Sequence, residues 1–207
     1  MGKYSETLNK RISTKCSDDG YCAICGIHGK LTKDHVPPKG CNNNGKIILK
    51  ELFAGENCQG RNFQAGVHFN TICRNCNTEL LGSKYDPELV KLSKEINNLA
   101  LAVNRGAIIL PSNVLVFLKP QKIARAIIGH FIAAHSCKEA RDGIVSSPFM
   151  DALRHYFLNE DEFLPKDVDI YFWVYPSRRQ VIIKHFSKAI LGNAEESSLY
   201  GGVLKFW

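Results

Sequence analysis

Two closely spaced pairs of cysteines constrain this 207-residue chain more than any other feature of its sequence. Cys22 and Cys25 form the first Cys-x-x-Cys pair, and Cys73 and Cys76 form the second after an interval of 47 residues. Two residues between thiols let both sulfurs face one ion, and two such pairs complete a tetrahedral shell of four sulfurs. We therefore expect a structural Zn²⁺ site. A redox-active Cys-x-x-Cys is the alternative, although it needs only one pair.

The overall composition is that of an ordinary globular protein. Hydrophobic residues make up 44% and charged residues 23%, which excludes a disordered, collagenous or coiled-coil chain. The apolar stretches are far shorter than the roughly 18 residues of a membrane-spanning helix, and the first residues lack the apolar core of a secretory signal. We expect no membrane association and a location in the reducing cytoplasm, where cysteines rarely form disulfides.

The periodicity of apolar residues predicts a mixed fold. Residues 1–20 read as a polar arm, residues 21–86 as a loop-rich metal-binding domain and residues 87–207 as a further domain of unknown role. Helical spacing and terminus signals predict helices at 87–105, 121–135 and 148–158. Short apolar runs predict strands at 30–32, 47–49, 67–72, 108–118, 168–175, 180–186 and 202–206.

The expected fold class is therefore α+β, with a zinc-stapled N-terminal half and a helical and antiparallel-β C-terminal half. The runs 168–175 and 180–186 are separated by a short turn, which predicts that they pair as a hairpin.

Three polar residues accompany the cysteines. Asp34 and His35 lie between the two pairs, and Asn77 directly follows the second pair. A carboxylate is a hard oxygen ligand for Mg²⁺ or Mn²⁺, and an adjacent imidazole can activate water against a phosphodiester. The Asn77 amide could offer the same ion a second oxygen. The alternative is a strand-end Asp-His pair that only hydrogen-bonds locally.

In these motifs the sequence resembles the HNH endonuclease superfamily, the ββα-metal nucleases, in the branch stapled by zinc through two Cys-x-x-Cys pairs. The resemblance covers residues 21–86 and implies a treble-clef-like ββα-metal fold. It further implies that Asp34 and Asn77 bind the catalytic ion and that His35 is the general base.

The resemblance also implies a residue that orients the catalytic imidazole on its Nδ1 side. His68 has the expected spacing and Asn70 is the nearest asparagine, so either residue can fill this role. Asp86 either binds the metal or caps the helix that follows, and we favour the cap. His130 lies on a predicted helix and is expected at the edge of the core or on the surface.

The resemblance implies hydrolysis of DNA with one catalytic Mg²⁺ or Mn²⁺ beside the structural zinc. The net charge of +7 favours an anionic partner such as nucleic acid. Lys33, Lys39 and Arg74 flank the motif residues and either bind phosphates or form ordinary solvated surface.

Three questions stay open at this level. The same site could act on RNA, or the chain could be a non-catalytic zinc-ribbon or treble-clef module that binds nucleic acid or protein. Double-strand cleavage would suggest a homodimer, because one active site cuts one strand at a time. A regulatory protein partner is also open.

Overall fold

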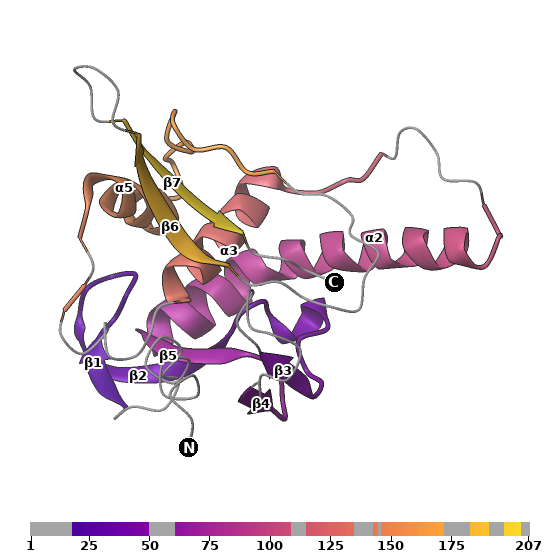
Figure 1. Cartoon of the computed structure of the whole chain (residues 1–207), viewed down its shortest axis with the longest axis horizontal. Coiled ribbons are helices and arrows are strands. Elements are labelled where there is room, and N and C mark those ends of the chain that lie inside the picture. Colours follow the sequence, from indigo (N-terminus) through magenta and orange to yellow (C-terminus); the bar gives the residue numbers. More distant parts are fainter. Residues whose placement is uncertain are drawn as a thin grey trace.

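Figure 1 shows the computed structural model of the chain, which describes residues 18–49, 61–108, 115–134, 143–144, 146–171, 183–190 and 197–203. These residues contain three α-helices and small antiparallel sheets, so the expected α+β class is confirmed. Most of the expected polar arm lies outside the described residues. Among the described helices, none has the length and apolar character needed to cross a bilayer.

A three-stranded antiparallel sheet carries Asp34, His35 and Cys73. Its strands are β1 (Asp19–Tyr21), β2 (His28–His35) and β5 (His68–Cys73), in the order β1-β2-β5. The strands expected at 30–32 and 67–72 are thus confirmed as parts of β2 and β5. The register between β2 and β5 shifts at Thr32 and Lys33, and His35 at the end of β2 lies opposite His68.

A second small sheet lies in the interval between the cysteine pairs. It joins β3 (Ile47–Leu49) to β4 (Arg61–Phe63), and it follows a 3-10 turn, η1 (Lys39–Cys41). The strand expected at 47–49 is confirmed, whereas its partner β4 carries no run of apolar residues and was missed.

A helical segment follows β5 directly. It begins as a π-helix, η2 (Asn75–Tyr85), and continues without a break as the α-helix α2 (Asp86–Asn104). At the join, the Asp86 N–H donates to the Leu81 carbonyl, five residues earlier. The expected helix at 87–105 is confirmed, but η2 escaped prediction because a π-helix does not repeat its apolar face every 3.6 residues.

Two more helices pack against this unit. The helix α3 (Pro120–Ala133) confirms the helix predicted at 121–135, although it ends one residue before Ala134, the last residue described there. The helix α5 (Pro148–Leu158) has the predicted bounds, because Ser147 caps it by accepting a hydrogen bond from the Met150 N–H.

The C-terminal hairpin differs from the prediction. It pairs β6 (Ile183–Ile190) with β7 (Ser197–Val203), and the described parts of the runs 168–175 and 180–186 do not pair with each other. Residues 168–171 form no strand, and 172–175 lie outside the described residues. Val168 and Ile170 pack against the core from a loop, which explains their apolar alternation. Residues 115–118 are not a strand either, and 109–114 lie outside the described part.

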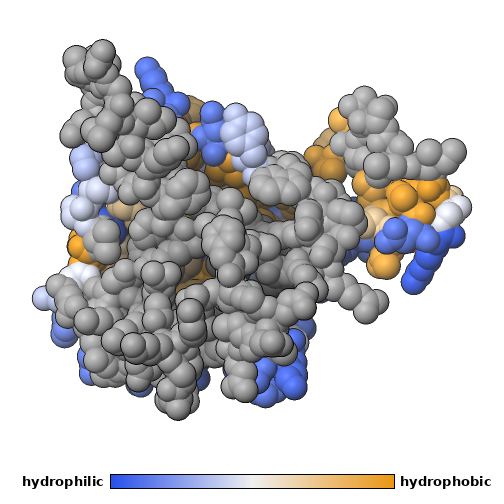
Figure 2. All heavy atoms as spheres, in the orientation of Figure 1, coloured by the Kyte–Doolittle hydropathy of each residue, from blue (hydrophilic) through white to orange (hydrophobic). Residues whose placement is uncertain are grey.

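One core connects the sheet to the helices. Buried side chains from β2, β5, η2, α3 and α5 belong to a single cluster that includes Leu31, Ile72, Leu81, Ile132 and Phe157. In Figure 1, the far end of α2 extends away from this body. Leu101 and Ile108 are exposed there, and Figure 2 shows the apolar surface that results.

Candidate functional site

The four motif cysteines come together where the sheet meets the helical segment. Cys22 and Cys25 occupy the turn between β1 and β2, Cys73 ends β5, and Cys76 lies in the first turn of η2. Their Sγ atoms all lie within 4.8 Å of one another. The Sγ atoms of Cys25 and Cys73 are 3.8 Å apart, and a tetrahedron with Zn–S bonds of about 2.3 Å has edges of about 3.8 Å. The cluster could therefore hold a zinc ion.

Local backbone hydrogen bonds shape the first cysteine turn. The Gly26 N–H donates to the Cys22 carbonyl at 2.8 Å, and Gly26 has a φ of 73°, a conformation that glycine adopts readily. The Cys73 N–H donates to the Cys22 Sγ at 3.3 Å. Backbone groups thus bring the two cysteine pairs together and aim their sulfurs at one point.

The thiols of this cluster titrate very differently from one another in the absence of a cation. Hydrogen bonds, chiefly from Cys76, lower the pKa of Cys22 to about 5, whereas burial raises the pKa of Cys25 to about 11. The hydrogen bond to Cys22 and burial raise the pKa of Cys76. Four thiolates at this spacing need a cation between them, and Zn²⁺ takes such a set of donors.

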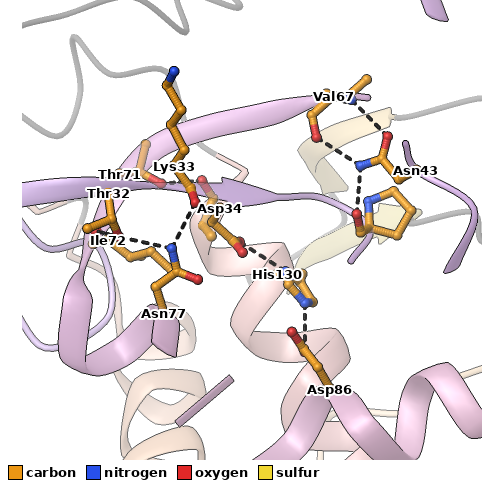
Figure 3. Close-up of polar contacts among 12 residues, drawn as sticks. Thr32, Lys33, Asp34, Asn43, Val67, Thr71, Ile72, Asn77, Asp86 and His130 are labelled. Carbon is orange, nitrogen blue, oxygen red and sulfur yellow. Dashed lines mark hydrogen bonds and ion pairs between the residues drawn. The ribbon is translucent and has the colours of Figure 1, made fainter. Parts of the chain in front are cut away.

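Asp34 and Asn77 lie on either side of the contact between β2 and η2 (Figure 3). The Asn77 Nδ2 donates to the Thr32 Oγ1 and to the Lys33 carbonyl, both at 2.9 Å. These two acceptors fix the orientation of the amide, because only its nitrogen can donate. The Asn77 Oδ1 is left to point toward the Asp34 side chain.

A histidine from α3 contacts the same carboxylate. His130 is fully buried, with its Nδ1 3.0 Å from the Asp34 Oδ2 and its Nε2 2.9 Å from the Asp86 Oδ1. Burial alone would lower the pKa of His130, but the two carboxylates outweigh it and raise the pKa to about 10. The expectation that His130 lies at the core edge or on the surface is therefore wrong.

Asp86 does not form the cap that was expected at the start of α2. The His130 ring lies between the Asp86 and Asp34 carboxylates (Figure 3). The start of α2 has no side-chain cap hydrogen bond. The side chain of Asp86 instead supports His130 from the side away from Asp34.

His35, the residue after Asp34, is only partly buried and lies at the end of β2. Its Nε2 is 3.1 Å from the Ala65 carbonyl. A carbonyl only accepts, so this contact places the hydrogen of a neutral ring on Nε2 and leaves Nδ1 as the basic nitrogen. Burial first, and then the charge of Lys39, lower the pKa of His35, although the hydrogen bond with the Ala65 carbonyl and the charge of Asp34 act in the opposite direction.

The contact that orients His35 differs from the expected one. His68 lies across the strand pair, with its ring centroid 5.5 Å from that of His35, but its Nδ1 contacts the Gly66 carbonyl. Asn70 is buried, and its Oδ1 has no hydrogen-bond partner among the described residues. The Ala65 carbonyl therefore takes the place expected for His68 or Asn70, and it acts on Nε2 rather than Nδ1.

Asn43 is a site residue that the sequence analysis missed. Its Nδ2 donates to the carbonyls of Pro37 and Val67, at 2.6 and 2.9 Å, and its Oδ1 accepts from the Val67 N–H at 2.8 Å. The side chain is fully buried. It joins the segment after His35 to the segment before β5, so it holds the open end of the hairpin together.

The three expected phosphate-binding residues are all exposed. Lys33 lies in β2, Lys39 opens η1, and Arg74 immediately precedes η2. Lys39 is near enough to His35 for its charge to affect the imidazole.

Comparisons of the chain with protein-family models, with curated proteins and with solved structures found no match.

Proposed function

We propose that the protein is an HNH-type endonuclease that hydrolyses phosphodiester bonds in DNA with one divalent metal ion. The observation that carries the proposal is the placement of Asn77. Its amide nitrogen donates hydrogen bonds to Thr32 and Lys33, so its oxygen faces the buried Asp34 carboxylate. Two hard oxygen donors next to a partly exposed histidine suit metal-assisted phosphodiester hydrolysis.

The donor set fits Mg²⁺ or Mn²⁺. Asp34 keeps one carboxylate oxygen outside its contact with His130, and Asn77 contributes an uncharged oxygen. Such an ion is bound by a few protein oxygens and keeps several of its waters. Once bound, it supplies a Lewis acid that stabilises negative charge on the phosphate and on the leaving oxygen.

His35 acts as the general base in this proposal. Its Nε2 is engaged by the Ala65 carbonyl, so Nδ1 takes a proton from the attacking water. The water oxygen forms a bond to phosphorus, the bond from phosphorus to the 3′ oxygen breaks, and the leaving oxygen gains a proton from solvent. The lowered pKa of His35 keeps the ring neutral, and therefore ready to accept a proton, near pH 7.

The charge of the protein supports an anionic substrate. The net charge is +7, and the exposed Lys33, Lys39 and Arg74 lie close to the site residues in the sequence. In the proposal these side chains bind phosphates on either side of the scissile bond. The zinc cluster has a structural role, because a closed shell of four sulfurs leaves no position for water or substrate.

The proposal is tested by incubating the purified protein with supercoiled plasmid, linear single-stranded DNA and structured RNA, with Mg²⁺, with Mn²⁺ or with a chelator. We expect metal-dependent cutting of DNA that His35→Ala reduces by at least about 100-fold, in line with the loss of a general base. The matched control is His155→Ala, because His155 is an exposed histidine on α5.

Full-rate cutting by His35→Ala would refute the assignment of the base. Preferred cutting of RNA would keep the site and change the substrate. If no nucleic acid is cut while salt-sensitive binding persists, the chain is better explained as a non-catalytic zinc module.

A further inference from the structure

The C-terminal half of the chain contributes a side chain to the candidate site. His130 comes from α3, 96 residues after Asp34, and its Nδ1 lies 3.0 Å from the Asp34 Oδ2. Its Nε2 lies 2.9 Å from the Asp86 Oδ1, at the start of α2. Ionised carboxylates only accept hydrogen bonds, so the ring donates from both nitrogens and bridges the two acids.

This bridge leaves the Asp34 carboxylate little freedom to rotate. The side chains of Asp34 and His130 are 5% and 0% exposed, so water cannot replace the contact. With Oδ2 held by the imidazole, the other carboxylate oxygen is left for a ligand. Asn77 presents its oxygen to the same region, as Figure 3 shows.

The helix that carries His130 is itself held tightly. Thr71 in β5 donates a hydrogen bond from its hydroxyl to the Ala133 carbonyl near the end of α3. Gly129 lies against Leu81 of η2 and Phe157 of α5, at a place where a β-carbon would collide with both side chains. The position of the imidazole is therefore set by three neighbouring elements.

We propose that His130 is a positioning residue that holds Asp34 in the orientation needed to bind the divalent ion together with Asn77. This inference rests on the proposed function, because it concerns the ion of that same site. It also gives the C-terminal half a role: α3 completes the metal site of the zinc-stapled hairpin. Groups that hydrogen-bond to metal ligands typically account for 10- to 100-fold in metal affinity or activity.

The test is Mn²⁺ binding by the full-length, zinc-loaded protein, measured by calorimetry or by the electron paramagnetic resonance of free Mn²⁺. Asp34→Asn in the same assay identifies the binding that belongs to this site. We expect His130→Gln to weaken that binding about 10- to 100-fold. Cleavage should fall at limiting Mn²⁺ and recover toward the wild-type rate at saturating Mn²⁺, which a purely structural defect would not allow.

The matched control is His155→Gln, the same substitution at an exposed histidine, which should leave Mn²⁺ affinity and cleavage unchanged. Zinc content and circular dichroism check the fold of each variant. If His130→Gln does not fold, Asp86→Asn provides the second test. It keeps an oxygen that can accept from His130 but removes the charge, so we expect a smaller weakening in the same direction.

The outcomes separate this inference from the proposed function. Weakened Mn²⁺ binding in His130→Gln, in a protein that cuts no nucleic acid, would support the positioning role and refute the nuclease. Cleavage with unchanged Mn²⁺ affinity in a folded His130→Gln or Asp86→Asn protein would overturn the positioning role alone. A wild-type protein without Mn²⁺ binding that depends on Asp34 would overturn it as well.

Discussion

At the scale of single residues, Asn43 shows how much a buried amide can organise. All three of its hydrogen bonds go to backbone groups, and they connect Pro37 with Val67 across the open end of the hairpin. The backbone groups that bond to Asn43 are buried, so water could not replace these hydrogen bonds if the side chain were removed. The segment that carries Asp34 and His35 is therefore anchored from outside the strand.

Asn43→Ala is expected to lower the free energy of unfolding by about 2–6 kcal/mol, because the buried Pro37 carbonyl and Val67 N–H lose their partner at about 1–3 kcal/mol each. The Val67 carbonyl still accepts from the Val36 N–H. Urea denaturation measures the change. The adjacent Asn44 is exposed, so Asn44→Ala is the control and should stay within about 0.5 kcal/mol of wild type. Equal effects of the two variants would contradict this role of Asn43.

Single residues also show which parts of the site could not be predicted from the sequence. The convergence of the four cysteines was predictable because one ion needs donors at a known spacing. Asn43 and His130 were not, because their contacts depend on tertiary structure. Asn43 contacts Val67, 24 residues away, and His130 contacts Asp34, 96 residues away. Neither residue belongs to a local sequence motif from which its role could be predicted.

At the scale of helices and strands, predictions that rested on local sequence signals were the most reliable. The bounds of α5 follow from Ser147 and the proline after it, which act within one turn of the helix. β6 pairs with β7, the next strand along the chain, whereas the alternation at Val168 and Ile170 reflects packing of a loop and not a strand. Helix termini are thus easier to predict than strand partners.

The packing of α3 against η2 and α5 depends on Gly129. A β-carbon there would lie 2.7 Å from the Leu81 Cδ2, and it would also collide with Phe157, which is fully buried. Overpacking of this kind costs about 1–3 kcal/mol, and the better helix propensity of alanine offsets about 1 kcal/mol of it.

We therefore expect Gly129→Ala to destabilise the protein by up to about 2 kcal/mol, which is the overpacking cost less the gain in helix propensity. Chemical denaturation gives the value. The control is Gly29→Ala in β2, where an added β-carbon would meet no atom within 4 Å. A stabilised Gly129→Ala protein would mean that α3 packs less closely than described.

At the scale of the whole molecule, the two expected domains share their interior. The core cluster includes Leu31 and Ile72 from before residue 86 and Ile132 and Phe157 from after it. Arg154 of α5 donates to the Ala23 carbonyl inside the first cysteine turn at 2.8 Å. Loss of zinc should therefore weaken the helices as well as the sheet.

Removal of zinc with a strong chelator is expected to lower the melting temperature while unfolding remains a single transition. A zinc contribution of about 5 kcal/mol, modest for a structural site, would shift the Tm of a chain this size by about 10–20 °C. Calorimetry with and without chelator measures the shift.

Cys22→Ser should also lose the metal, as measured by zinc content. The buried Cys41 lies outside the cluster, so Cys41→Ser is the control and should retain the metal. An unchanged Tm after chelation, or zinc retained in Cys22→Ser, would refute the metal site.

The π-helical segment limits where residues can be inserted into this chain or deleted from it. Asn77 lies near the start of η2, and Asp86 begins α2 directly after its end. A change of one residue between them would rotate Asn77 about the helix axis by somewhat less than the roughly 100° per residue of an α-helix, because a π-helix has a wider turn. The amide oxygen would then leave Asp34, although no chemical group had been lost. The number of residues in this segment is thus as specific a requirement as the identity of its polar side chains.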